Sequence, residues 1–582
     1  VPFPTSNPHP GLPVLTCLKP YRRVGQAMQA LLILSALSVW TSFAHQLAGL
    51  KTTLRQVRQL HADESSASRM SPLAGCDGLE CVKKYVALPD ASFSWQDIGV
   101  RAQRTDFTAY VLNMTSQSWL PANATDLVAW WHPIVVIVPA DLDTLHAADW
   151  ATIYIGGAGV YNRDLQDPAA LEHVADIASG VQLATRSRSI VAVLMQVPNQ
   201  EIVFSDDPAK LHRWEDEIKA YSWRQGVDHP EQPEWPIEMP NVKAVVRAMD
   251  VLTAFSKKIE LPLPKGSSLE RFGLIGASKR GMAAYMTAAV DSRVKAIVPM
   301  VISMDHAVAM HQFFMQFGNL PSASKDYFDS GVFGFDGTSA LDRVFRIIDP
   351  SRYMESLSLP KLVVMAGNDD FFPVDASHTW YSRLPGQSFF RMVPNSVHSM
   401  SSDEFLPSAV SFFRNFLLGA DAPRIAWTLD DENGMVHVQQ QSNHTPLMVR
   451  TWRAFTCDGR RRDFRMVNAD TGLNCWRCGW QEGRKCHNLK VYWSSTPTEA
   501  VGPGAWTASV GALPAGRGWG AVFVELEYPG PDPDGPNWRL TSEVLISPKT
   551  YPFPDCQGAA CAGTGLVLQQ QNMSGKSPVV DS

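Results

Sequence analysis

A serine stands between glycines in the stretch "FGLIGASKRG" (residues 272–281). A short apolar run ends at Gly276, Ser278 follows two residues later, and Ala-rich, helix-prone sequence comes next. A strand–turn–helix junction of this kind lifts a serine hydroxyl above a sheet and needs small neighbours. The N–H of the next residue, Lys279, then points at the oxyanion that forms during acyl transfer. The common pattern has glycine where this chain has Arg280, so a serine that caps a helix is the competing interpretation.

A nucleophilic serine needs a histidine as its base and a carboxylate that orients the histidine. Both follow Ser278 in the chain order that this type of site requires. Three aspartates stand in "NDDFFPVD" after the apolar run "KLVVMAG", and His398 stands in "PNSVHSM" after the next apolar run. We favour Asp370 as the acid, because it lies three residues after the glycine that ends the first run, and Asp369 and Asp375 remain alternatives. In the competing interpretation the aspartates form turns and the histidine is a loop residue.

A second N–H donor for the oxyanion is expected in the loop after an earlier strand. The stretch "TIYIGGAGVYN" supplies a glycine turn there, and Gly157 and Ala158 are the candidates, with a plain turn as the alternative. Its glycine spacing is not that of a dinucleotide-binding loop, so we expect no cofactor. His306 and His311 in "MDHAVAMHQFF" lack the spacing of a helical metal pair. We therefore predict no metal site and expect both histidines in a cap.

Apolar runs that alternate with helix-like patterns must position these loops, and they extend from about residue 129 to 419. Continuous apolar runs are typical of parallel strands that helices cover on both faces. The pattern predicts a doubly wound α/β domain with a mostly parallel sheet. Residues 303–359 interrupt it with aromatics and glycines, which indicates a cap insertion. The predicted strands are 134–140, 152–157, 190–197, 271–277, 294–302, 361–367 and 388–394, and the predicted helices are 214–225, 241–259, 279–290 and 405–419.

The character of the chain changes after about residue 421, where short, often alternating segments are separated by Gly, Pro and Asn turns. This pattern predicts a C-terminal antiparallel β-sandwich. The expected organisation is a signal peptide or signal anchor (1–44), an N-terminal segment with the first strand (45–105), the α/β catalytic domain (106–420), the β-sandwich (421–555) and a tail (556–582).

Composition narrows the classes of function. Hydrophobic residues make up 45% of the 582 residues and charged residues 19%, which is typical of folded domains and excludes a disordered chain. The formal net charge of −6 provides no basic field that would attract nucleic acid. The length predicts two or more domains.

The N-terminal region has the pattern of a secretory signal. Lys19, Arg22 and Arg23 precede the apolar segment "ALLILSALSV" (residues 30–39), and small residues follow in "TSFA". The apolar core is shorter than a membrane-spanning helix usually is. We therefore expect a secreted protein, with an uncleaved signal anchor as the alternative and as its one expected contact with a membrane.

Cysteines and glycosylation sequons also favour secretion. Sequons begin at Asn113, Asn123, Asn443 and Asn572. Eight cysteines follow the signal, and an even number in a secreted chain suggests disulfides: Cys76, Cys81, Cys457, Cys475, Cys478, Cys486, Cys556 and Cys561. Cys76 with Cys81, and Cys556 with Cys561, would close short loops. The middle four are an alternative zinc set, because Cys475 and Cys478 have ligand spacing.

Longer strings of the sequence, in the same order, match a known family. The chain resembles the PhoPQ-activated pathogenicity-related family, which includes the autocrine proliferation repressor proteins, over about residues 80 to 555. The matching strings include "YVALPDASFSW", "WWHPIVVIVP", "VPNQEIVFSDDP", "WEDEIKAYSW", "IGASKRG", "AGNDDFFPVD", "VPNSVH", "GWGAVFVELEYP" and "TSEVLISPKTYPFP". The Cys-rich stretch "NCWRCGWQEGRKCHN" (474–488) departs from the family pattern.

The resemblance implies an α/β-hydrolase fold with a cap and a C-terminal β domain, in a secreted or membrane-associated protein. It also implies a triad of Ser278, Asp370 and His398. The leading hypothesis is a secreted serine hydrolase that acts on a peptide or an ester, and Lys279 and Arg280 would favour a substrate with a carboxylate, such as a uronate ester. The alternative is a secreted signalling or binding protein that keeps the fold without turnover and contacts a cell-surface receptor.

Overall fold

A computed structural model describes residues 71–157, 171–258, 261–466 and 491–563, together with the short strands at 468–470, 480–482, 485–487, 567–568 and 579–580. Several predictions made from the sequence lie outside the described residues: the signal segment, Ala158, Cys475, Cys478 and the sequon at Asn572.

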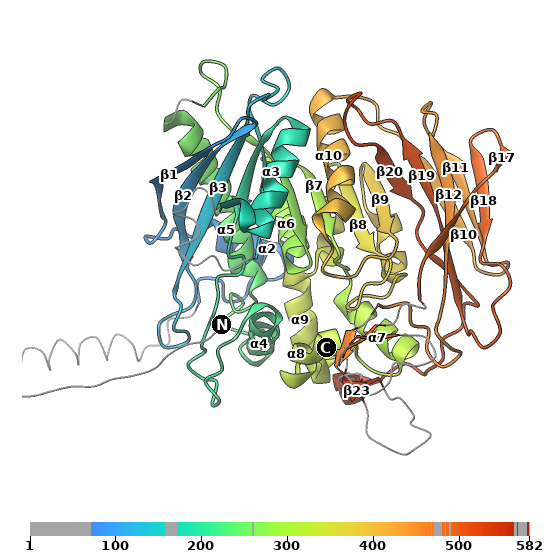
Figure 1. The fold of residues 1–582 in the computed structure, drawn as a ribbon. Coiled ribbons are helices and arrows are strands. Elements are labelled where there is room, and N and C mark those ends of the chain that lie inside the picture. The colour runs from blue at the N-terminus through green and yellow to red at the C-terminus, as the bar shows by residue number, and fades with distance from the viewer. Residues whose placement is uncertain are drawn as a thin grey trace, which may run out of the picture. The chain divides into compact units, whose positions relative to one another are not determined.

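One large sheet forms the centre of the α/β region (Figure 1). In the described residues its strand order is β1-β2-β3-β5-β4-β6-β7-β8-β9. Strands β1 to β3 pair antiparallel, β3 also pairs antiparallel with β5, and the strands from β5 to β9 run parallel. Their bounds are β1 Ser94–Gln103, β2 Phe107–Ser118, β3 Ala129–Pro139, β4 Trp150–Ile155, β5 Ile190–Leu194, β6 Arg271–Ala277, β7 Val294–Met300, β8 Lys361–Ala366 and β9 Ser388–Val393. The predicted mostly parallel sheet is confirmed.

Helices cover both faces of this sheet, which explains why its central strands are apolar throughout. Side chains of α3 (Ala175–Ser187) and α10 (Ser402–Leu418) belong to one buried cluster. Side chains of α2 (Gly78–Ala87), α5 (Glu238–Lys258) and α6 (Lys279–Val290) belong to another. The two clusters are the cores on the two sides of a doubly wound sheet, which is the α/β architecture that the sequence predicted.

The segment between β7 and β8 forms a helical cap. It contains α7 (His306–Phe317), α8 (Lys325–Asp329) and α9 (Ser339–Ile348), with 3-10 turns at Ser322–Ser324, Val332–Phe335 and Pro350–Ser356. Helix α4 (Glu215–Asp228) packs against α8 and α9. Figure 1 shows α4, α7, α8 and α9 at one end of the sheet.

The C-terminal region is antiparallel β structure, as the alternating pattern predicted. One four-stranded sheet has the order β10-β11-β18-β17, and a five-stranded sheet contains β16-β12-β19-β20 with β21 also paired to β19. The bounds are β10 Ile425–Asp430, β11 Met435–Gln440, β12 Met448–Phe455, β16 Ser494–Pro497, β17 Ala500–Gly502, β18 Ala505–Ser509, β19 Gly520–Tyr528, β20 Trp538–Thr541 and β21 Leu545–Ser547. Small additional sheets pair β13 Asn468–Asp470, β15 Lys485–His487 and β14 Trp480–Glu482, and β22 Val567–Leu568 with β23 Val579–Val580. Among the helices of the described residues, none combines the length and the hydropathy of a membrane span.

The β region is fastened to the loop that follows β8. The Asn368 amide donates to the carbonyls of Phe464 (2.7 Å) and Val491 (3.0 Å), and the Trp493 indole donates to the carbonyl of Gly367 (2.8 Å). These contacts fix the backbone on which the candidate acids stand.

A buried ion pair joins the same two regions. The Arg462 guanidinium lies 2.6 Å from the Asp375 carboxylate, and both side chains are buried. Burial would raise the pKa of Asp375, but the charge of Arg462 and hydrogen bonds from Arg462 and Gln316 hold it below its usual value. Asp375, one of the alternative acids, is therefore a structural residue.

We expect Arg462→Ala to lower the free energy of unfolding by about 3–5 kcal/mol, because it leaves the Asp375 carboxylate buried without its cation. Urea denaturation followed by tryptophan fluorescence measures the change. Lys325→Ala is the control: it breaks an exposed pair with Asp329 and should change stability by less than about 1 kcal/mol. Equal effects of the two substitutions would contradict the structural role of the buried pair.

Candidate functional site

Ser278 occupies a strained turn between β6 and α6. Its φ is 55° and its ψ is −127°, an uncommon conformation for a residue with a side chain. Such a conformation costs about 1–3 kcal/mol and persists only where the surroundings hold it. Here the Ser278 N–H donates to the Met300 carbonyl (2.8 Å) on the neighbouring strand. Ser278 is thus held at the carboxyl end of the parallel sheet, as the strand–turn–helix pattern predicted.

The two glycines that frame the serine are required by close packing. A Cβ at Gly276 would lie 2.6 Å from the Arg280 carbonyl oxygen, and one at Gly281 would lie 2.9 Å from the Ile302 side chain. Any side chain at either position would push the helix away from the sheet. Small neighbours are therefore part of the turn, and the Ser278 side chain, at the N-cap position of α6, makes no capping hydrogen bond.

His398 follows β9 and contacts one aspartate directly. Its Nδ1 lies 3.0 Å and 3.1 Å from the two carboxylate oxygens of Asp369, which is 1% exposed. Asp369 Oδ1 also accepts the N–H groups of Phe371 (2.7 Å) and Phe372 (3.0 Å). The tight turn thus aims the carboxylate at the imidazole, and Nδ1 is engaged while Nε2 is left for a substrate or a nucleophile.

The geometry corrects our preference for Asp370 as the orienting acid. Asp370 Oδ1 accepts the main-chain N–H of His398 at 3.2 Å and makes no hydrogen bond to its ring. The two aspartates are adjacent in the sequence. The N–H groups of Phe371 and Phe372 hold the carboxylate of the first, Asp369, against the imidazole. The imidazole is therefore oriented by Asp369, the alternative, while Asp370 holds the backbone of the histidine loop.

Three carboxylates set the charge state of His398. Burial alone would lower the pKa of its imidazole, but the negative charges of Asp369, Asp370 and Asp216 and the hydrogen bond to Asp369 raise it above its usual value. Burial and the charge of Asp369 raise the pKa of Asp370 in turn.

Ser278 opens into a cavity of about 30 Å³ beneath the cap. Phe371 and Phe372 line this cavity, and both rings also contact the His398 ring, with centroids 5.1 Å and 5.9 Å apart. Among the described residues no hydrogen bond joins the Ser278 hydroxyl to His398. The remaining lining residues come from α4, the segment just after β7 and the cap: Asp216, Lys219, Trp223, Ile302, His306, Ala309, Met310, Phe313, Ser324, Tyr327 and Phe333.

The expected second oxyanion donor is otherwise engaged. The Gly157 N–H donates to the Asp176 carboxylate at 3.1 Å. A Cβ at Gly157 would lie 1.7 Å from Arg280 Nη2, so the guanidinium packs directly on this glycine. The Lys279 N–H stands in the first turn of α6, where N–H groups have no acceptor within the helix. Of the predicted donors in the described residues, Lys279 is the one that this geometry favours.

The basic side chains beside Ser278 are neutralised by two acids that sequence analysis did not single out. Lys279 Nζ lies 2.9 Å from both Glu215 and Asp216, and Arg280 Nη2 lies 2.6 Å from Glu215. The proposed attraction of a carboxylate substrate by these cations therefore has no support. The acidic run in "WEDEIK" contains both of these acids, but from the sequence we interpreted it only as the start of a helix.

The two cap histidines have different surroundings. His306 lines the Ser278 cavity, whereas His311 Nδ1 lies 2.7 Å from Asp555 and 3.6 Å from Cys556 Sγ. His311, Cys556 and Cys561 bring possible metal-binding atoms close together, but the two sulfurs form a disulfide. Both predicted short disulfides, Cys76–Cys81 and Cys556–Cys561, are present. Cys457 is also disulfide-bonded, which removes it from the alternative zinc set.

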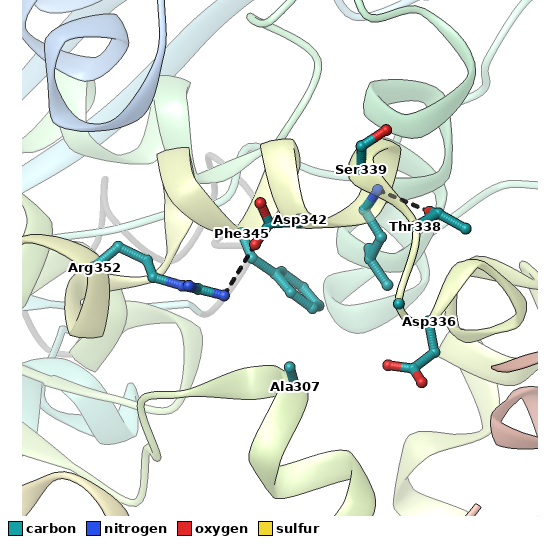
Figure 2. Close-up of a pocket in the computed structure, with 9 residues that line it drawn as sticks. Ala307, Asp336, Thr338, Ser339, Asp342, Phe345 and Arg352 are labelled. Atoms are coloured by element: carbon teal, nitrogen blue, oxygen red, sulfur yellow. Dashed lines mark hydrogen bonds and ion pairs between the residues drawn. The ribbon is translucent and has the colours of Figure 1, made fainter. Parts of the chain in front are cut away.

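A larger cavity of about 440 Å³ lies between α9 and the start of α7 (Figure 2). Figure 2 shows Asp336, Thr338 and Phe345 around it, and the Arg352–Asp342 ion pair (3.1 Å) closes one side. Neither Ser278 nor His398 lines this cavity. It is therefore not a place where the predicted nucleophile could act.

Comparisons with known proteins agree with the resemblance to this family. The sequence profile of the family described as PhoPQ-activated pathogenicity-related protein matches residues 82–465. Autocrine proliferation repressor protein A of Dictyostelium discoideum is 29% identical over 495 residues, which cover 83% of this chain and 93% of that protein.

Solved structures that match part of the chain include two esterases. Acetyl xylan esterase 1 from Thermoanaerobacterium sp. is 14% identical, covers 58% of this chain and 92% of its own, and has a TM-score of 0.37. Glucuronoyl esterase from Solibacter usitatus is 15% identical, covers 61% and 93%, and has a TM-score of 0.35. Likeness at this level says nothing about substrate.

The family profile spans more than half of the sequence, and the chain belongs to the PhoPQ-activated pathogenicity-related protein family.

Proposed function

We propose that this protein is a serine hydrolase that cleaves a carboxylic ester or a peptide through Ser278, His398 and Asp369. The observation that carries the proposal is a strained serine that lines a cavity, together with a histidine–aspartate pair whose imidazole contacts two aromatic walls of the same cavity. Strain at a residue with a side chain is typical of active sites. The aromatic residues Phe371 and Phe372 link both halves, because they line the cavity and contact the imidazole.

In the proposed reaction Ser278 Oγ attacks the carbonyl carbon of the substrate while its proton moves to His398 Nε2. The Asp369 carboxylate holds the proton on Nδ1 and stabilises the imidazolium. The Lys279 N–H, at the positive end of α6, stabilises the oxyanion. The leaving alcohol or amine takes the proton from His398, and water then releases the acyl group by the same steps in reverse. Catalytic hydrogen bonds are often long when no substrate is bound. The proposal therefore requires the Ser278 hydroxyl and the His398 imidazole to form a hydrogen bond only when a substrate binds.

We also propose that the protein acts outside the cytosol. The disulfides Cys76–Cys81 and Cys556–Cys561 favour an oxidising compartment, which agrees with the signal-like N-terminal segment. An uncleaved N-terminal segment would make the protein a membrane-anchored one.

A second candidate function is signalling or receptor binding without turnover. Two observations favour it: the Ser278 hydroxyl makes no hydrogen bond to His398 among the described residues, and the Dictyostelium relative is named for repression of proliferation. The two functions differ in whether Ser278 reacts.

A fluorophosphonate probe should label the wild-type protein and leave Ser278→Ala unlabelled, because the probe captures a serine that a nearby base activates. Gel fluorescence and mass spectrometry of the labelled peptide measure the result. A matched control is Ser324→Ala, which removes another serine of the same cavity and should keep the labelling. A folded wild-type protein that stays unlabelled would favour the binding protein.

The adjacent aspartates should differ in their effects on turnover. We expect Asp369→Asn to lower kcat by about 10²–10⁴-fold, because the imidazole loses the carboxylate that fixes its tautomer and stabilises its charge. Asp370→Asn keeps an oxygen that accepts the His398 N–H, so a loss below about tenfold is expected. Ester hydrolysis in a pH-stat compares the two. The reverse order of effects would return the acid role to Asp370.

The pH profile should report the raised pKa of His398. The neutral imidazole is the base, so activity is lost as pH falls through its pKa in the folded protein. The half-maximum of kcat/KM is therefore expected above about pH 6.5, the ordinary histidine value. Asp370→Asn should move the half-maximum to lower pH, because Asp370 is one of the charges that raise this pKa. A wild-type half-maximum below pH 6 would contradict the assignment.

A further inference from the structure

A second histidine–aspartate pair borders the cavity that holds Ser278. His306 is the first residue of α7, and its Nδ1 lies 2.9 Å from Asp349 Oδ2. The Asp349 carboxylate also accepts the main-chain N–H groups of Asp305 (3.1 Å) and His306 (2.7 Å). Burial would raise the pKa of Asp349, but the contacts with His306 and with main-chain N–H groups hold it well below its usual value. Asp349 is thus an anion that accepts the Nδ1 proton.

The other ring nitrogen of His306 has no partner. Nε2 is buried and makes no hydrogen bond, and it is the only side-chain atom of the described cavity lining in that situation. The ring cannot turn freely to find one. Phe345 stacks on it with centroids 5.7 Å apart, and Trp223 packs edge-on at 5.1 Å. Buried polar atoms of native proteins nearly always have partners, so an unpaired one calls for an explanation.

A structural role for the pair accounts for Nδ1 and leaves Nε2 unexplained. Asp349 anchors the start of α7, and that task needs Nδ1 alone. His311 on the same helix provides the contrast: its Nδ1 lies 2.7 Å from Asp555, its Nε2 lies 3.4 Å from Asp336, and it does not line the cavity. Of the two cap histidines, the one beside Ser278 is the one with an unused nitrogen.

We propose that His306 recognises the substrate, with Nε2 accepting a hydrogen bond from a hydroxyl or an amide N–H of the group that enters this cavity. The proposal rests on the proposed hydrolase function and adds the chemistry of its substrate. With a proton on Nδ1 directed at Asp349, the neutral form of the ring offers a lone pair at Nε2. The surrounding walls are largely apolar and aromatic, with Trp223, Phe333 and Phe371 among them. The recognised group is therefore compact and mostly apolar and carries one hydrogen-bond donor.

Binding to a Ser278→Ala protein tests this recognition separately from turnover. Two matched ester pairs serve as probes: methyl 3-hydroxybutyrate against methyl butyrate, and N-acetylglycine methyl ester against methyl 4-oxopentanoate. The first pair differs by a hydroxyl and the second replaces an amide N–H by CH₂. Titrations followed by NMR give the dissociation constants. We expect the donor-bearing member of one pair to bind about 10–100-fold more tightly. The pair that discriminates tells a hydroxyl-bearing substrate from a peptide-like one.

His306→Asn in the same background should reduce that ratio to about one. The asparagine amide can still donate to Asp349 from the position of Nδ1, so α7 keeps its anchor while the Nε2 acceptor is lost. His306→Gln, which places an amide oxygen near the position of Nε2, should restore part of the preference. His311→Asn is the matched control and should leave the ratio unchanged. Circular dichroism and melting temperature confirm that each variant folds.

The outcomes separate the two proposals. A preference that His306→Asn leaves intact, or no preference in either ester pair, overturns the recognition by His306. A preference that depends on His306, in a protein whose intact Ser278 is not labelled by the fluorophosphonate probe, supports the recognition site and overturns the hydrolase function. A dependence on His306 in both binding and kcat/KM supports both.

Discussion

The loop after β8 is the constraint on which the candidate site depends. It carries Asp369, and hydrogen bonds hold it from both sides. Asn368 and Trp493 tie it to the β region, and its N–H groups at Gly367 and Asn368 donate to carbonyls of the loop that leads to His398. The candidate acid and the candidate base thus stand on two segments that are bonded to each other, and the first of these segments is also bonded to the β region. The β region therefore helps to hold the candidate site in place.

A network of ion pairs also holds the turn that carries Ser278. Lys279 and Arg280 extend from the turn to Glu215 and Asp216 at the start of α4, and Asp216 also accepts the hydroxyl of Tyr327 in the cap (2.8 Å). These ion pairs are partly buried, so their geometry is more restricted than that of surface pairs. The strained serine is thereby held between a parallel sheet and a network of ion pairs. Asp216, a member of this network, lines the cavity, and its negative charge helps to raise the pKa of His398.

The sequence allowed much of this arrangement to be predicted, because it rests on local patterns. The strand–turn–helix at Ser278 and the order of serine, acid and histidine follow from apolar runs and turn residues. The choice between Asp369 and Asp370 could not be predicted from these patterns, because both aspartates stand in one loop. A turn of the main chain decides which carboxylate faces the imidazole ring.

Long-range contacts account for the other differences. Gly157 donates to Asp176, which stands 19 residues later, and Asp216 meets Lys279 across 63 residues. The unpaired nitrogen of His306 is visible only once the cap is folded. None of these contacts leaves a periodic signal in the sequence.

The packing of Arg280 on Gly157 has a consequence for how this family can vary. Any side chain at position 157 would occupy the space of the guanidinium, and a shorter residue at position 280 would leave Glu215 without one of its two cations. Each change on its own is unfavourable. Coordinated changes at positions 157, 280 and 215 avoid both the clash with the guanidinium and the loss of a cation beside the carboxylate. These three positions should therefore be inherited as a coupled set, and sequence divergence among relatives should preserve combinations of residues rather than individual ones.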